Sequence, residues 1–474
     1  MSAPVPDLTR DLGAREAVSR DWSGLSMTPE AVSTPRSAAE VGDLLAWASS
    51  SGTAVTAAGG QTSTTGASIT DRGVLLSLRA MDAILDIDAG ARTMRVEPGA
   101  LVGDIKRAAA EHGLLFAPDP TSEEECTIGG SIACNASGAR SLRYGATRVH
   151  VRGLRVALAN GRIADLRRPQ LEKNTVGLAL AHDPVDWFIG SEGILGVVVE
   201  AELTLLPLPA QVIGLAVPFA SEHDALAFVL HARGMLDRSR EAPELRQEFP
   251  VHPRCLEYFD RAAVAIASGA VGEHGWSGAG AMVYTEEEFG AGIEPDLDAW
   301  LALAEHHGAA ADDARVYTSA GELREARRMR HAVPTTMTER ASAFRAAGGR
   351  RVSTDWAVPV RRMAAVLDAS ARIAERAGIE RAVTYGHAGN GHPHQNYVAR
   401  DAEELRRMEA VVGETLALVI AEGGTVAAEH GIGKLKRRWL PLQSSPLQTG
   451  VMRAVKRELD PAGILAPGNV LDPE

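Results

Sequence analysis

Cysteine is scarce in this sequence, and its few copies are not spaced as a metal or redox motif. The 474 residues contain three cysteines, Cys126, Cys134 and Cys255, and no two of them form a CxxC pair. A low, odd count fits a reducing compartment and gives no iron–sulfur or zinc-ribbon pattern. Proteins built on cysteine-bound metals are therefore not indicated.

Long apolar runs and long basic runs are missing too. No apolar run approaches the ~20 residues that a membrane-spanning helix needs. Residues 1–22 carry charges throughout and lack an apolar core, so they do not resemble a signal peptide. The net charge is −12 with both signs scattered, which argues against nucleic acid or anionic membrane as the main partner. We expect a cytoplasmic protein without a membrane span.

The composition that remains is that of a globular protein, with 45% hydrophobic and 23% charged residues. The length predicts two or three domains. No repeat period or low-complexity tract is visible.

The first ~210 residues alternate between helical and strand patterns, which predicts an α+β domain with many short strands. Ser37 and Glu40 have capping-box spacing ahead of an apolar stripe, and Gly52 stops that helix. Asn160–Gly161 predicts the turn of a hairpin. The other predicted elements are strands at 53–60, 73–78, 83–88 and 93–99, a helix at 100–113 and a strand pair within 193–207.

The pattern changes after Pro207 and Pro209, where longer helical stretches mix with isolated strands. Residues 221–236 and 294–308 read as helices, and residues 381–387 read as a strand. Residues 401–424 predict an amphipathic helix whose apolar face is Leu405, Met408, Val412, Leu416 and Val419. We interpret this region as a second domain.

Three glycine-rich clusters lie in the first half of the chain. Residues 57–68 follow a strand, and their consecutive amides suit a phosphate, although a plain turn is equally consistent. This cluster is not GxGxxG, so a Rossmann site is not supported. Residues 118–145 have almost no large side chains, so they cannot build a core but can lie flat against a bulky ligand. The third cluster, residues 190–207, is another glycine turn that leads into a strand.

A histidine-rich loop, "YGHAGNGHPHQN" at residues 385–396, contains His387, His392 and His394. Such a loop can be solvated surface, a metal site or a proton-transfer site. A strand over "GHPHQN" puts His392, His394 and Asn396 on one face. Glu429 and His430 form a second polar pair after the amphipathic helix. Two imidazoles and one carboxylate, with open positions left, form the ligand set of a catalytic divalent metal.

The three glycine clusters resemble, in order and spacing, the FAD-binding domain of the vanillyl-alcohol oxidase and p-cresol methylhydroxylase flavoprotein family. The C-terminal half is similar to one branch, which contains D-lactate dehydrogenases, the FAD subunit of glycolate oxidase and D-2-hydroxyglutarate dehydrogenases. "HAGNGHPHQN" is similar to its HxGDGNxHxN motif, "AAEHGIGKLK" to GEHGIG, and "DPAGILAPGNVL" to DPxxILNPGKV. The resemblance runs from about Thr34 to Leu471. This sequence departs from the pattern at Asn390, His392, Ala466 and Asn469.

The resemblance implies a two-domain α+β flavoprotein with a PCMH-type FAD-binding domain and an α+β substrate, or cap, domain built on an antiparallel sheet. The expected FAD-binding domain spans residues 1–210, with its core at about 34–210. Residues 211–424 would form the cap domain, and residues 425–474 would return to the FAD domain and complete the active site. FAD is expected to be bound non-covalently, since no histidine in the 118–145 cluster stands out as an attachment point.

The resemblance also assigns residues to the cofactors. A divalent metal, Zn²⁺ or Mn²⁺, is expected on His387, His394 and Glu429. The cofactor-binding residues for FAD are expected to be Gly59, Gly60, Gln61, Thr62, Ser63, Gly66, Pro118, Thr121, Thr127, Gly129, Gly130, Asn135, Ser137, Gly138, Gly190, Glu192, Gly193, Gly196 and Asn469.

The expected reaction is oxidation of a D-2-hydroxy acid to the 2-oxo acid by hydride transfer to the flavin. His430 and Asn396 would face the substrate, and an imidazole with an ordinary pKa near ~6.5 suits a general base at neutral pH. Arg330, in "RRMRHAVP", is the first candidate for the substrate carboxylate, against the alternative of a solvated helix face. Arg350 and Arg351 are weaker candidates, and His392 suits either substrate contact or support of the metal ligands.

Two other functions stay open at this point. One is a flavin-dependent transferase resembling alkylglycerone-phosphate synthase, which uses the same fold without net redox change. Glu429 directly before His430 favours the dehydrogenases, since the synthase pattern has histidine there. The other is a non-catalytic FAD-binding subunit, against which the intact histidine and glutamate set counts. The substrate, the electron acceptor and the formation of a homodimer are left open by the sequence.

Overall fold

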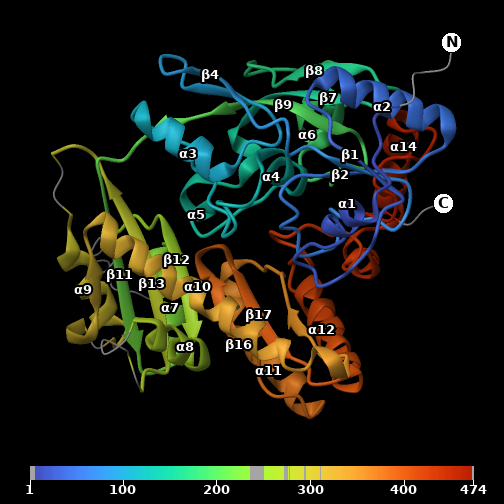
Figure 1. Cartoon of the computed structure of the whole chain (residues 1–474). Helices are drawn as coiled ribbons and strands as arrows, with labels where there is room; N and C mark the ends of the chain where they lie inside the picture. The colour runs from blue at the N-terminus through green and yellow to red at the C-terminus, as the bar shows by residue number, and fades with distance from the viewer. Residues whose placement is uncertain are drawn as a thin grey trace. The chain divides into compact units, whose positions relative to one another are not determined.

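The computed structural model describes residues 6–234, 250–271, 276, 278–292, 295–309 and 311–471. The chain divides into two compact units, and Figure 1 labels many of their helices and strands. The first unit comprises Met1–Gly138, Gly145–Leu208 and Glu429–Glu474, and the second comprises Ala139–Tyr144 and Pro209–Ala428. The sequence-based division was set at 210 and 424.

The first unit contains a five-stranded antiparallel sheet in the order β4-β5-β9-β7-β8. The predicted hairpin is confirmed, because β7 pairs with β8 and Gly161 takes a left-handed φ of 83° in the turn between them. The strands are β4 (Ile84–Asp88), β5 (Thr93–Val96), β7 (Val151–Ala157), β8 (Ile163–Arg167) and β9 (Val197–Thr204).

The strand pair predicted within 193–207 is wrong. Residues 197–204 form the single long strand β9, and β10 (Leu206–Pro207) pairs instead with β6 (Leu114–Leu115). Only Leu205 separates β9 from β10, and an antiparallel hairpin needs a connection of about two residues to reverse the chain. The apolar residues 197–207 therefore form two successive strands that do not pair with each other: β9 pairs with β5 and β7, and β10 pairs with β6.

A three-stranded parallel sheet, ordered β1-β3-β2, lies in the same unit. Its strands are β1 (Ala31–Ser33), β2 (Val55–Ala58) and β3 (Val74–Ser77). Helix α2 (Ala38–Ser51) connects β1 to β2. The predicted limits of α2 are confirmed, since the Ser37 side chain caps its first turn and Gly52 ends it in the left-handed conformation. The predicted stripe on α2 is buried.

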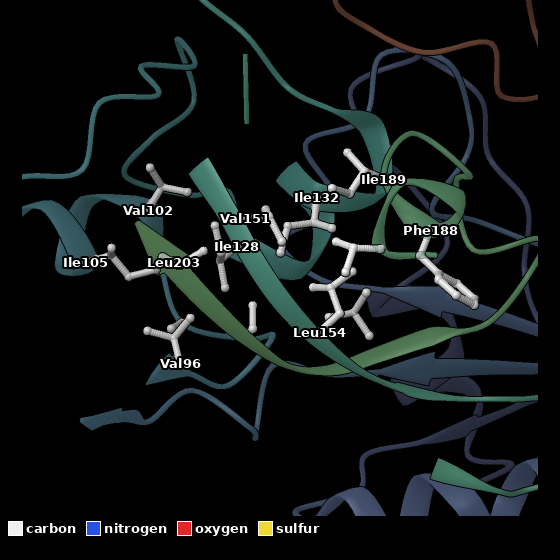
Figure 2. Packing of buried hydrophobic residues seen from close by; sticks show 14 of the residues in the cluster. Val96, Val102, Ile105, Ile128, Ile132, Val151, Leu154, Phe188, Ile189 and Leu203 are labelled. Atoms are coloured by element: carbon white, nitrogen blue, oxygen red, sulfur yellow. The ribbon is translucent and has the colours of Figure 1, made fainter. Parts of the chain in front are cut away.

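Short helices pack onto the five-stranded sheet to form the core of the first unit. Ile128 and Ile132 of α4 (Ile128–Cys134) and Ile105 of α3 (Val102–Glu111) are fully buried in one cluster with strand residues such as Leu154 and Leu203. Figure 2 shows these side chains gathered together. Helix α4 thus places the small-residue cluster of 118–145 on a buried apolar base. The unit also contains α1 (Leu12–Ala17), α6 (Val185–Phe188), α13 (Leu440–Gln443) and α14 (Pro446–Leu459).

The second unit is built on a seven-stranded antiparallel sheet in the order β14-β11-β13-β12-β16-β17-β15, as the family resemblance implied. Its strands are β11 (Gln211–Phe219), β12 (Cys255–Asp260), β13 (Ala281–Phe289), β14 (Arg315–Tyr317), β15 (Arg351–Ser353), β16 (Val383–His387) and β17 (His392–Val398). Its helices are α5 (Ser141–Tyr144), α7 (Glu222–Ala232), α8 (Arg261–Val271), α9 (Leu297–His306), α10 (Ala320–Ser342), α11 (Met363–Arg376) and α12 (Ala402–Ala421).

The helices predicted in this unit form where their patterns placed them. α12 buries Met408, Leu416 and Val419 of its predicted face, and Asp401 caps its first turn. α10 begins with a capping box between Ser319 and Glu322. Of the predicted helix at 221–236, residues 235–236 lie outside the described residues. Among the residues described, none of the helices is both long enough and apolar enough to cross a lipid bilayer.

Candidate active site

The first glycine loop follows β2 and presents a run of backbone amides. Among the described residues, no acceptor is bonded to a backbone amide between Gly59 and Thr64. The carbonyls of Gly59 and Gly60 accept from the Arg79 guanidinium, at 3.1 Å from Nε and 2.8 Å from Nη2. Arg79 therefore holds the carbonyls, and the amides stay available for an anion such as a phosphate.

Several of the predicted cofactor glycines are required by packing inside the protein. A Cβ on Gly59 would lie 2.0 Å from Thr127 Oγ1, and one on Gly60 would lie 2.1 Å from the Glu125 carbonyl. The loop therefore presses directly against the segment that starts α4. The same argument holds for four others, with nearest approaches of 2.9, 2.7, 2.2 and 2.6 Å, at Gly66, Gly129, Gly138 and Gly196.

Three predicted cofactor glycines have space in front of them instead. The nearest atom to a Cβ built on Gly130 is Thr127 Oγ1 at 3.4 Å, and the values for Gly190 and Gly193 are 3.6 and 3.9 Å. Gly190 and Gly193 also have left-handed φ angles of 79° and 77°. No packing within the unit explains the missing side chain at Gly130, which is consistent with a ligand lying against it.

Some polar residues predicted to bind the cofactor are bonded to the protein main chain. Gln61 Nε2 donates to the Val18 carbonyl at 2.9 Å, and Asn135 Oδ1 accepts from the Arg148 amide at 2.9 Å. Ser63 Oγ accepts from the Thr65 amide at 3.2 Å, and Thr127 Oγ1 caps α4. These side chains shape the glycine loops. Of the remaining predicted residues, Pro118 is buried, Thr121 is exposed, and Thr62 and Ser137 are half-buried.

Glu192 and Asn469 tie the last segment of the chain to the first unit. The buried Glu192 carboxylate accepts from the amides of Ile432 and Gly433, at 2.6 and 2.7 Å. Burial raises the pKa of Glu192, and the two amide bonds oppose that rise. Asn469 Nδ2 donates to the Ala67 carbonyl at 2.8 Å. The turn after His430 is thereby fixed against the first and third glycine clusters.

The histidine-rich loop forms a β-hairpin in the second unit. β16 and β17 pair so that His387 lies opposite His392, with the turn η9 (Ala388–Asn390) between them. His387, His392 and His394 are only 3–6% exposed, and one nitrogen from each lies within 4.8 Å of the others. The hypothesis of a solvated loop is therefore wrong, because the three imidazoles are buried together.

A buried carboxylate that the sequence analysis did not identify lies against this cluster. Glu257 of β12 is fully buried and contacts His387 Nδ1 at 2.6 Å and Arg330 Nε at 2.5 Å. Burial alone would raise the pKa of Glu257, but the charges of Arg330 and His387 outweigh it and hold the pKa at about 2. The sequence feature that could have identified Glu257 is its position as a charged residue inside the otherwise largely apolar strand "CLEYFD".

Asp355 is a second missed carboxylate. It is 2% exposed, and its Oδ1 lies 3.1 Å from His392 Nε2. In the chain, it follows β15 by two residues, in "STDWAVP". Two buried carboxylates thus accompany the three buried imidazoles.

The predicted substrate residues of the second unit have partners inside the protein. Arg330 lies on α10, is 9% exposed and places Nη2 3.3 Å from His387 Nδ1, so it is not a solvated residue. Asn396 is buried, and its Oδ1 accepts from Arg351 Nε at 2.8 Å. Arg350 contacts Glu409 at 2.7 Å. These contacts fix the side chains and leave their substrate roles as predictions.

Glu429 and His430 begin the last segment of the first unit. Glu429 directly follows Ala428, whose amide donates to the Asp355 carbonyl at 2.8 Å within the second unit. The His430 carbonyl accepts from the buried Thr65 hydroxyl at 3.4 Å. The residue directly before the predicted ligand Glu429 is thus hydrogen-bonded to the backbone of Asp355.

The donor set in the second unit fits a divalent transition metal. Imidazole nitrogens suit zinc and its neighbours. His387 contacts Glu257 through Nδ1, and its Nε2 lies 3.4 Å from Arg330 Nη2. A carboxylate behind a histidine ligand is the usual arrangement in metal sites. The first unit fits a dinucleotide cofactor through the amide run at 59–64 and the open faces of Gly130, Gly190 and Gly193.

Two family models match the chain. The model for the FAD binding domain matches residues 29–167, and the model for the C-terminal domain of FAD linked oxidases matches residues 236–470. Solved structures of alkyldihydroxyacetonephosphate synthase share the fold, with a TM-score of 0.67 at 16% identity over 97% of this chain and 82% of that chain.

Three relatives extend over most of the chain. Glycolate oxidase subunit GlcD of Bacillus subtilis is 30% identical, over 93% of this chain and 89% of the relative. D-lactate dehydrogenase of Archaeoglobus fulgidus is 32% identical, over 92% and 90%. D-2-hydroxyglutarate dehydrogenase of Xanthomonas citri pv. viticola is 31% identical, over 99% and 95%. Matched at both its FAD-binding and its C-terminal domain, the chain belongs to the family of FAD-linked oxidases.

Proposed function

We propose that this protein oxidises a D-2-hydroxy acid of the D-lactate, glycolate or D-2-hydroxyglutarate class to the 2-oxo acid, with FAD as the hydride acceptor. The observation that carries the proposal is the buried cluster of His387, His392 and His394 in a member of the FAD-linked oxidase family. The relatives at 30–32% identity bear names of enzymes that act on such acids. The cytoplasm is the proposed location.

Each cofactor would supply one kind of chemistry. The isoalloxazine of bound FAD supplies the redox change. A divalent ion, Zn²⁺ or Mn²⁺, held by His387, His394 and Glu429 would supply Lewis acidity that makes a substrate hydroxyl easier to deprotonate. FAD would be held by the glycine clusters of the first unit without a covalent bond.

The side chains of this protein would then move the proton and hold the substrate. His430 is the proposed general base for the C2 hydroxyl, because a neutral imidazole accepts a proton near neutral pH. Glu257 would hold His387 in the tautomer with Nδ1–H toward the carboxylate, which presents Nε2 as a ligand. Arg330 would place positive charge where the substrate carboxylate binds, and Asn396 would contact the substrate.

The synthase function is not favoured. The likeness to alkyldihydroxyacetonephosphate synthase is at 16% identity and carries the fold alone. Relatives at about twice that identity have dehydrogenase and oxidase names. Glu429 directly before His430 also follows the dehydrogenase pattern.

Anaerobic bleaching of the flavin tests the proposal. The purified protein is mixed without oxygen with D- and L-2-hydroxy acids in turn, and the visible flavin absorbance is followed. We expect one or more D-acids to bleach the flavin fully and their L-enantiomers to do so far more slowly. A protein with full FAD occupancy that no 2-hydroxy acid reduces would refute the proposed function.

Acid precipitation tests the mode of FAD binding. We expect the flavin to stay in the supernatant when the polypeptide precipitates. Flavin that remains with the pellet after washing would show a covalent bond.

A further inference from the structure

A second group of histidines lies in the second unit and takes no part in the proposed reaction. His231 is in the last turn of α7, His306 is the last residue of α9, and His307 is the C-cap residue of α9. His231 is 6% exposed, His307 is half-buried and His306 is exposed. The group therefore runs from a buried base to the surface.

The three rings face one another closely. His231 Nδ1 and His307 Nε2 are 3.1 Å apart, and the ring centroids are separated by 5.0–5.7 Å. One nitrogen from each ring lies within 4.8 Å of the other two. A tetrahedral zinc ion with bonds of about 2.0–2.1 Å holds its nitrogens about 3.3–3.4 Å apart. The pair His231 and His307 is already near this spacing, and the site would require the exposed His306 ring to turn and bring in the third nitrogen.

The fold explains how neighbouring residues reach one point. Successive side chains of an α-helix point about 100° apart, so two of them share a ligand only where the helix ends. His307 is the C-cap residue of α9, with φ −98° and ψ 21°, and its Nε2 lies 3.1 Å from His231 Nδ1 of α7. The two helices are held together by the aromatic contact between Phe228 and Trp300, whose ring centroids are 6.0 Å apart.

The nearby charge also favours a cation. Burial and the two other imidazoles lower the pKa of His307 to about 4, and the negative charge of Asp224, two turns before His231 on α7, opposes this lowering. Asp224 lies on the same face of α7 as His231, because seven residues make about two helical turns. Three imidazoles and an open fourth position are a known ligand set for zinc.

We propose that His231, His306 and His307 form a tri-histidine site for a divalent transition-metal ion of the zinc class, separate from the proposed catalytic ion. Bound there, the ion would join the C-terminal ends of α7 and α9. The alternative explanation for the close approach of His231 and His307 is a direct hydrogen bond between their rings, which needs no ion.

Metal counting on variants of the FAD-loaded protein tests the site. Metal-free protein is loaded with Zn²⁺, freed of loose ions by gel filtration and measured by elemental analysis, with Co²⁺ absorption spectra as a second probe. We expect two ions per chain in the wild type and one in His306→Ala. The affinity of that site should fall at least ~100-fold, since even the loss of a group behind a ligand typically costs 10–100-fold. Flavin reduction should be unchanged.

Two further variants make the result unambiguous. His223→Ala removes an exposed histidine from the same helix α7 and should keep both ions. His394→Ala should lose only the proposed catalytic ion, so failure of that site is seen separately from failure of this one. The proposal is overturned if His306→Ala binds as many ions as the wild type with the same affinity. It is also overturned if the ion at this site is shared between two chains, seen as a zinc-dependent dimer on gel filtration.

Discussion

The predicted site of the first unit is made mainly of backbone groups, whereas that of the second unit is made of side chains. In the first unit the candidate contacts are backbone amides at 59–64 and the open faces of glycines, with few charged side chains among them. In the second unit they are buried side chains, three imidazoles with Glu257, Arg330 and Asp355. A site made of backbone is damaged by adding a side chain, whereas a site made of side chains is damaged by removing one.

The largest effect is expected from Gly130→Trp, which should abolish FAD binding. A Cβ at Gly130 meets nothing closer than 3.4 Å, so the fold should tolerate the change while the indole fills the space expected for the cofactor. The ratio of flavin to protein absorbance measures occupancy, and circular dichroism checks the fold. Gly130→Ala should keep FAD. Gly129→Ala should instead lower stability, since its Cβ would lie 2.7 Å from Pro98. Full flavin occupancy in Gly130→Trp would remove this glycine from the cofactor site.

The next largest effect separates the metal from the base. His394→Ala should lose bound metal and activity together while keeping FAD. His430→Ala should keep metal and FAD but slow the chemical step, because a positioned general base is typically worth ~10²–10⁴-fold. Elemental analysis and stopped-flow flavin reduction of both variants measure the two effects. If the wild type holds no divalent ion and chelators leave flavin reduction unchanged, His387, His394 and Glu429 have no metal role.

Local patterns in the sequence were enough for much of the fold. The stripe on α12, the caps of α2 and the strand expected over residues 391–396 each depend on residues within a few positions of one another, and all three elements form. The strand pair within 193–207 failed because partner choice depends on the rest of the sheet. The domain boundaries and the roles of the site residues stay predictions.

The surroundings of the histidine cluster could not be predicted in the same way. Glu257 meets His387 across 130 positions of the chain, and Arg330 reaches both from α10. Only the pairing of β12 with β16 brings these residues together, and no local pattern encodes that register. The sequence showed the imidazoles, and the tertiary fold showed which charges accompany them.

Acid should weaken the second unit more than the first. Burial would raise the pKa of Glu286, but Arg140 and Arg254 outweigh it and hold the pKa at about 2. A carboxylate with a lowered pKa stabilises the fold above its ordinary pKa, and this contribution is lost as the pH falls from 4.5 toward 2. The loss for this group is on the order of 3 kcal/mol, at 1.36 kcal/mol per pKa unit. Glu192 in the first unit has a raised pKa, so its protonation in acid relieves the cost of burying its charge. Glu200 of β9 has a pKa that Arg155 and Arg95 lower against the effect of burial, but unlike Glu286 it is not fully buried.

Hydrogen exchange read by mass spectrometry compares the units directly. Between about pH 6 and about pH 3, after correction for intrinsic rates, β12 and β13 should lose protection before β7 and β9. Glu286→Gln should start less stable and show a flatter response to acid. Earlier loss of protection in β7 and β9 would contradict the assignment.

The smallest effect is expected from Glu257→Asp, which tests whether a side-chain site depends on the length of its supporting carboxylate. Aspartate keeps the negative charge for Arg330 but withdraws the oxygen that lies 2.6 Å from His387 Nδ1. His387 would then be free to rotate, and losing such a partner typically costs ~10–100-fold in metal affinity or activity. Zinc affinity and the rate of flavin reduction should both fall by this factor with FAD occupancy unchanged.

Glu286→Asp is the matched control. It shortens a glutamate on the neighbouring strand that contacts arginines and Tyr284 instead of a histidine, and it should leave zinc affinity at the wild-type value. Equal losses of zinc affinity in the two variants would mean that Glu257 acts only through the stability of the sheet.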